Sequence, residues 1–91
     1  MDKQYERESK ITDKSKEEQE FELIISILKA RKELEEANKN FEYAESELID
    51  YYSYQIKANS SKLNYLLRKA KNNGIVLDEI NRAQIKYNKA I

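Results

Sequence analysis

The side chains that could do chemistry in this sequence are carboxylates, ammonium groups and tyrosine hydroxyls, because the 91 residues contain no histidine and no cysteine. The commonest general base, the commonest metal ligand and the strongest nucleophile are therefore missing. Neighbouring carboxylates occur at Glu35 and Glu36 and again at Glu42 and Glu45. On the helix predicted below they fall on the outer, solvated face, where carboxylates keep ordinary reactivity.

Two further kinds of site are not encoded. Carboxylate di-metal sites in helical bundles use Glu-x-x-His pairs that project inward, and a chain without histidine cannot build them. Phosphate-binding loops need several glycines, whereas this chain has one. We therefore expect a protein that is not an enzyme and that uses no cofactor, no metal and no small-molecule substrate.

Basic residues offer the alternative of nucleic-acid binding, because Lys and Arg attract phosphates and exposed tyrosines such as Tyr54 and Tyr65 can stack on bases. Against this, the basic positions are scattered around the predicted second helix and the net charge is zero. Nucleic-acid binding is therefore the weaker hypothesis. The basic residues concerned are Lys57, Lys62, Arg68, Lys69, Lys71, Arg82, Lys86 and Lys89.

The composition favours one domain of long helices. Charged residues make up 37% and apolar residues 40% of the chain, with no proline and a single glycine to break helices. The sequence has no apolar run of about 18 residues, as a transmembrane helix needs, and its charged N-terminus lacks the apolar stretch of a secretory signal. The apolar residues 21–28 have acidic neighbours, which disfavours membrane-surface binding. We expect a cytoplasmic protein.

The charges differ between the two halves of the chain. Residues 1–48 hold 9 Lys/Arg and 14 Asp/Glu, whereas residues 49–91 hold 8 Lys/Arg and 3 Asp/Glu. Halves of opposite sign attract when they fold against each other. We therefore favour charge pairing within one molecule over a dedicated acidic or basic binding face.

The first helix is predicted over residues 15–44. Residues 1–14 lack an apolar period and are expected to form a disordered or frayed charged tail. Ser15 and Glu18 fit a capping box. From there the apolar residues follow a regular heptad seam, which consists of Leu23, Ile27, Ala30, Leu34, Ala37, Phe41 and Ala44.

A turn at 45–47 and a second helix over 47–72 follow. The step of five from Ala44 to Ile49 breaks the heptad, and Ser46 could cap a new helix. One continuous helix remains an alternative, because Leu48 could continue the first seam. Asn73 and Gly74 provide a strong helix stop. The second seam consists of Ile49, Tyr52, Ile56, Asn59, Leu63, Leu66 and Ala70.

An antiparallel, coiled-coil-like hairpin follows from this turn. Folding the chain there places Leu34 opposite Asn59, Ala30 opposite Leu63, and the remaining seam residues in the same register. Asn59 could select the register or reach solvent at the edge of the seam. Residues 75–91 are predicted to form a short C-terminal helix with Asp78 as N-cap, which is marginal unless it docks.

One partner helix cannot cover all the apolar residues of this hairpin. Two coverings are possible. The segment 75–77 could fold back on residues 21–28, or a second copy could pack there to give a dimeric four-helix bundle. We favour self-association, because a core of this size rarely suffices alone. The candidate interaction surface comprises Phe21, Ile24, Ile25, Leu28, Tyr51, Tyr65 and Leu67.

The middle of the chain resembles the YaaL-like family, short bacterial proteins of unknown function. The likeness covers residues 24–75, and its main carriers are Phe41, the run Leu48-Ile49-Asp50 and the run Tyr65-Leu66-Leu67. The resemblance implies no chemistry, because the family has no assigned activity. It also places the acidic N-terminal tail and residues 76–91 outside the shared part.

Together these observations predict an all-α, non-catalytic protein-interaction module. It would self-associate as a dimer or dock on another cytoplasmic protein. A weak nucleic-acid-binding accessory protein that uses the basic second helix is the alternative.

Overall fold

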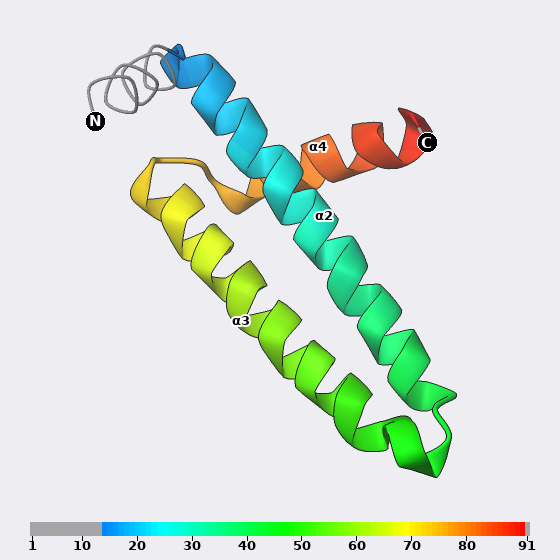
Figure 1. Ribbon diagram of the computed structural model, residues 1–91. Helices are drawn as coiled ribbons and strands as arrows, with labels where there is room; N and C mark the ends of the chain where they lie inside the picture. The colour runs from blue at the N-terminus through cyan, green and yellow to red at the C-terminus, as the bar shows by residue number, and fades with distance from the viewer. Residues whose placement is uncertain (1–13, 91) are drawn as a thin grey trace, which may run out of the picture.

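A computed structural model shows the architecture and describes residues 14–90 (Figure 1). These residues form three α-helices, α2 (Lys16–Glu42), α3 (Ile49–Asn72) and α4 (Leu77–Ala90), and one short 3-10 helix, η1 (Ser46–Leu48). No strand occurs within residues 14–90, so the predicted all-α class is confirmed. Helices α2 and α3 pack against each other as an antiparallel hairpin. The tail predicted for 1–14 lies, apart from Lys14, outside the described residues.

Helix α2 begins where the sequence predicted. The backbone N–H of Glu18 donates to the Ser15 side-chain oxygen at 3.1 Å, which satisfies one of the free donors at the helix start. Ser15 itself is extended, as an N-cap residue should be. Glu17 and Glu18 lie in the first turn, where the helix dipole favours carboxylates. The helix ends at Glu42, two residues before the predicted end.

The break between α2 and α3 is real, so the alternative of one continuous helix is wrong. Its geometry also differs from the prediction. Ser46 is not a helix cap: it opens η1, and Glu45 occupies the N-cap position without a side-chain cap. The Leu48 N–H donates to the Glu45 carbonyl at 2.8 Å. This 3-10 turn takes up three residues, so α3 begins at Ile49 rather than at residue 47.

The pairing register agrees with the heptad prediction. The Asn59 side-chain amide donates to the Glu33 backbone carbonyl at 3.5 Å, and the Lys62 ammonium lies 3.6 Å from the Glu33 carboxylate. Both contacts place residue 33 opposite residues 59–62. Asn59 is half-buried and bonds across the seam to α2. Lys62–Glu33 is also the single ion pair between helices in residues 14–90, so the expected intramolecular charge pairing is sparse.

The seam is closed at one end of the hairpin and open at the other. Ile27, Ala30 and Ala37 of α2 and Ala70 of α3 are buried. Near the turn, by contrast, Phe41 is 40% and Ile49 is 41% exposed, although both were predicted seam residues. The chain that joins the two helices there, from Tyr43 to Leu48, is irregular apart from the short 3-10 helix.

A tight reversal at Gly74 ends α3. The Ile75 N–H donates to the Ala70 carbonyl at 2.9 Å and the Gly74 N–H to the Lys71 carbonyl at 3.1 Å, the two bonds of a Schellman motif. Gly74 has a φ of +79°, a conformation that costs other residues about 1–2 kcal/mol. The reversal places Ile75 in the core beside Ala70, where it is 5% exposed.

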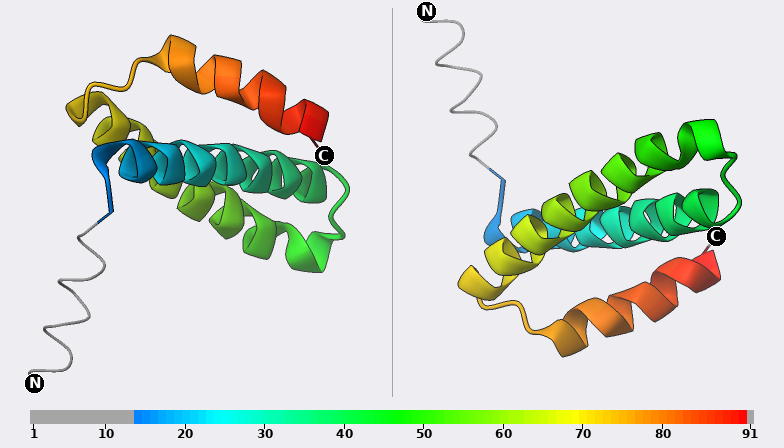
Figure 2. Two further views of the ribbon diagram at one scale, coloured as in Figure 1. Left: turned by 90° about the horizontal axis from the view of Figure 1, so that it is seen from above. Right: turned by 90° about the horizontal axis from the view of Figure 1, so that it is seen from below.

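Helix α4 crosses α2 at a steep angle, on the side opposite α3 (Figures 1 and 2). Ile80 of α4 is 2% exposed and joins Ile27, Leu28, Ala70 and Ile75 in one buried cluster. The Arg31 guanidinium donates to the side-chain oxygens of Asn81 at 3.2 Å and Gln84 at 3.5 Å. Residues 75–90 thus supply the cover that the sequence left open.

The start of this helix differs from the prediction. Helix α4 begins at Leu77, so Asp78 lies in its first turn and is not the N-cap.

The Cα radius of gyration is 16.8 Å, whereas a compact chain of this length would have about 12 Å. Three helices in this arrangement therefore leave much of their surface in solvent.

Replacing Ile80 with Ala tests whether α4 is docked. Ile80→Ala should lower the free energy of unfolding by about 2–5 kcal/mol, because it empties a buried site. Ile85→Ala is the matched control, since Ile85 is on the same helix and 58% exposed, and should change it by less than about 0.5 kcal/mol. Urea unfolding followed by circular dichroism gives both values. Equal effects would show that α4 is not docked through Ile80.

Candidate interaction surface

The structure divides the seven predicted surface residues into two groups. Leu28 is 1% exposed and belongs to the core, so its place on an accessible surface was wrong. Ile24, Ile25 and Leu67 are half-buried and pack against that core. The physical reason is the cover supplied by Ile75 and α4.

The second group is accessible. Phe21 is 64%, Tyr51 54% and Tyr65 55% exposed. Phe21 lies in the second turn of α2, whereas both tyrosines lie on α3. The seven residues therefore do not form one continuous surface, and Phe21 and the two tyrosines of α3 are the part of the prediction that remains accessible.

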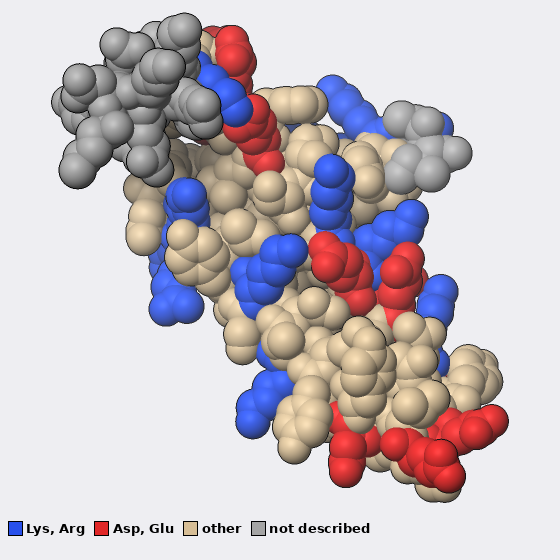
Figure 3. Space-filling model, viewed as in Figure 1, with Lys and Arg blue, Asp and Glu red and all other residues tan. Residues whose placement is uncertain are grey.

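Several accessible apolar residues lie at the turn end of the hairpin, where the seam prediction had missed them. Besides Phe41 and Ile49, Tyr43 is 84% and Leu48 is 45% exposed. Residues 40–56, which we call the acidic tip, contain four acidic residues and neither Lys nor Arg. Figure 3 shows acidic side chains gathered at this end of the molecule.

The carboxylates of the acidic tip form no ion pair within residues 14–90. The ion pairs of residues 14–90 involve Glu22, Glu33 and Glu35, and none involves an acidic residue of the tip. The sequence did carry a signal for this surface, the absence of Lys and Arg over 17 consecutive residues. The acidic residues of the tip are Glu42, Glu45, Glu47 and Asp50.

A second accessible surface runs along α3. Tyr51, Ala58 and Tyr65 follow one another at heptad spacing and are all exposed; we call them the tyrosine stripe. The ring of Tyr51 contacts that of Tyr52 edge-on, with centroids 5.0 Å apart. Its hydroxyl accepts a hydrogen bond from the Gln55 side chain at 2.8 Å. These two contacts orient the Tyr51 side chain within the chain itself.

The basic residues considered for nucleic-acid binding are all exposed. They are divided between α3 and α4, which lie on opposite sides of α2. In the view of Figure 3 basic side chains occur along both edges of the molecule rather than in one patch. The structure thus makes them accessible without aligning them.

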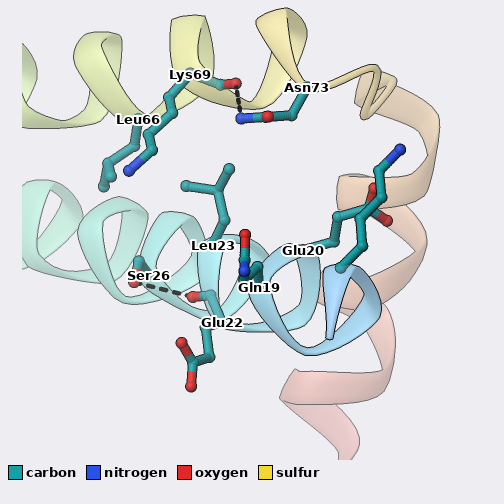
Figure 4. Close-up of a pocket in the computed structure, with 9 residues that line it drawn as sticks. Gln19, Glu20, Glu22, Leu23, Ser26, Leu66, Lys69 and Asn73 are labelled. Carbon is teal, nitrogen blue, oxygen red and sulfur yellow. Dashed lines mark hydrogen bonds between the residues drawn. The ribbon is translucent and has the colours of Figure 1, made fainter. Parts of the chain in front are cut away.

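A shallow groove of about 370 Å³ lies between the start of α2 and the end of α3 (Figure 4). Leu23 points from α2 toward α3 across it. Two of its polar groups bond to their own helices: the Asn73 side-chain amide donates to the Lys69 carbonyl at 2.8 Å, and the Ser26 hydroxyl to the Glu22 carbonyl at 3.0 Å.

A second groove, of about 430 Å³, lies where α3 passes into α4 and is mainly apolar. Its lining includes Leu67, Ile75 and Leu77.

Within residues 14–90 no three His, Cys, Asp or Glu side chains come together as a metal site would require. Across the same residues, no helix has the length and apolar character needed to cross a membrane.

Comparison with known proteins gives one match. The chain matches, over residues 5–77, the model of a family described as "Protein of unknown function (DUF2508)". The chain belongs to this family. The YaaL-like resemblance is consistent with membership of DUF2508. No curated protein and no solved structure matches the chain.

The DUF2508 match covers both accessible surfaces, the acidic tip and the tyrosine stripe. It includes the hairpin, the acidic tip, the tyrosine stripe and the reversal at Gly74, and it ends at Leu77, the first residue of α4. The rest of α4 lies beyond the match, as the resemblance implied. The match begins at residue 5, so the expectation that the N-terminal tail is an addition was wrong.

The division between core and surface can be tested with one pair of substitutions. Leu28→Gln should lower the free energy of unfolding by about 2–5 kcal/mol, because it places an amide in an apolar core. Phe21→Gln, on the same helix, should change it by less than about 0.5 kcal/mol. Thermal unfolding followed by circular dichroism compares them. A tolerated Leu28→Gln would mean that Leu28 is accessible after all.

Proposed function

We propose that this DUF2508 protein is a non-catalytic, cytoplasmic protein-interaction module that acts by self-association. The observation that carries the proposal is the number of large apolar and aromatic side chains left accessible after the three helices have packed. Surfaces of this kind mark protein–protein contacts in soluble proteins. Those on the hairpin near or along α3 are Phe41, Tyr43, Leu48, Ile49, Tyr51, Tyr54 and Tyr65, each at least 40% exposed.

The small core supports self-association in particular. Only seven apolar residues are buried in the described chain, and three of them are alanines. Domains of this size commonly need a disulfide, a metal or a partner chain for stability, and this chain has no cysteine. Two hairpins paired in a dimeric four-helix assembly would bury further apolar surface without adding any new element.

Docking on another cytoplasmic protein is the second mode of the same module, and the acidic tip favours it. An apolar cluster surrounded by unpaired carboxylates suits a partner that presents apolar side chains flanked by Lys or Arg. This mode needs no self-association. The two modes are therefore separated by the oligomeric state of the purified chain.

Molar mass from size-exclusion chromatography with light scattering tests the proposal. Across a roughly hundredfold range of concentration, we expect the mass to rise from that of the 10.8 kDa chain to twice this value and then to stay constant. A mass that remains that of one chain throughout would contradict self-association and leave docking on another protein as the mode of action.

The alternative function, weak nucleic-acid binding, rests on eight exposed basic residues of α3 and α4, of which only Lys62 pairs with a carboxylate within residues 14–90. Phosphate contacts make such binding sensitive to salt. For an interaction module we expect no shift of labelled single- or double-stranded DNA by low micromolar protein at about 50 mM salt. A shift that disappears as salt is added would favour the alternative.

A further inference from the structure

The tyrosine stripe has the geometry of a helix–helix contact. Its three residues lie one heptad apart, so they follow one side of α3 with only a small angular drift. Tyr51 and Tyr65 are more than half exposed, and the small Ala58 lies midway between them. A small residue between two large ones allows a second helix to approach closely at the centre, as Ala30 and Ala37 do within the hairpin.

The charges beside the stripe define the direction of that second helix. Glu47 and Asp50 lie at its start, whereas Arg68 and Lys69 lie at its end. All four side chains are exposed, and none forms an ion pair within residues 14–90. A parallel copy would place like charges together, but an antiparallel copy places each acidic end beside a basic end.

Nothing in the described chain covers this side of α3. Helix α4 lies across α2 from it (Figure 2), and the buried seam of α3 is already occupied by α2. A second copy supplies a basic end for the acidic end of the stripe and an acidic end for its basic end. The tyrosine stripe also lies wholly within the DUF2508 match.

We propose that two copies of this chain pack α3 against α3 in antiparallel orientation, with the two-fold axis passing beside Ala58. This inference rests on the proposed self-association and specifies its surface and register. Tyr51 of each copy lies against Tyr65 of the other, and aromatic pairs of this kind stabilise interfaces beyond the area that they bury. The two α3 helices lie at the centre of the four-helix assembly, with the α2 helices outside them.

Disulfide cross-linking tests the register directly, because the natural chain has no cysteine. In the full chain, Ala58→Cys places the two thiols beside the axis, within the Cα separation of about 7 Å that a disulfide allows. Mild oxidation should convert this variant to a covalent dimer that thiol reductants reverse. Light scattering under reducing conditions verifies that the variant still forms the non-covalent dimer.

Tyr51→Cys is the matched control for orientation. In the antiparallel register the two copies of residue 51 lie about 21 Å apart along the helices, so the variant alone should not cross-link. Tyr65→Cys alone should not cross-link either, whereas an equal mixture of the two variants should form the mixed covalent dimer. A parallel pair would instead cross-link Tyr51→Cys with itself.

The outcomes separate this inference from the proposed function. A natural chain that stays monomeric in light scattering contradicts self-association, and the inference fails with it. A stable dimer in which Ala58→Cys does not cross-link, or in which Tyr51→Cys cross-links with itself, overturns the antiparallel α3 contact but leaves self-association standing. Cross-linking at Ala58 together with the mixed dimer establishes the contact.

Discussion

The hydrogen bond from the Ile75 N–H to the Ala70 carbonyl is the interaction on which the rest of this fold depends. It requires the positive φ of Gly74, a conformation that glycine adopts without a steric penalty. Because the chain reverses there, Ile75 enters the cluster formed by Ile27 and Leu28, and α4 begins beside α2 instead of extending away from it. Without this reversal, the most apolar stretch of α2 would have only α3 to cover it.

The reversal at Gly74 also separates the residues that stabilise the fold from the residues that remain accessible on its surface. Burial is concentrated at the end of the hairpin where the chain reverses, while the turn end lacks a third element and leaves Phe41 and Ile49 partly exposed. The acidic tip and the tyrosine stripe both belong to the part that α4 does not reach. If the chain acts as the interaction module proposed above, a residue exchanged on these surfaces would alter partner binding with little effect on the core.

The sequence predicted the features that depend on local chemistry and periodicity. Ser15 caps α2, Gly74 ends α3, and the heptads place Leu34 opposite Asn59, next to the Glu33 carbonyl that Asn59 contacts, because each of these follows from a few neighbouring residues or from a repeat. Two features could not be predicted: the geometry of the turn and the element that covers Leu28. The turn contains neither glycine nor proline, and Ser46, whose residue type suits a helix cap, does not form one. Periodicity showed that Leu28 needed cover, but the choice between α4 and a second copy depends on contacts distant in sequence.

Hydrogen–deuterium exchange of the full chain tests whether the reversal at Gly74 closes the core, because amide exchange reports local opening. We expect that the amides of residues 27–30 of α2 and of Ile75 exchange slowest, and that residues 38–41, within the same helix but near the turn, exchange at least about tenfold faster. Equal protection along α2, or rapid exchange at Ile75, would contradict a core closed by the reversal at Gly74.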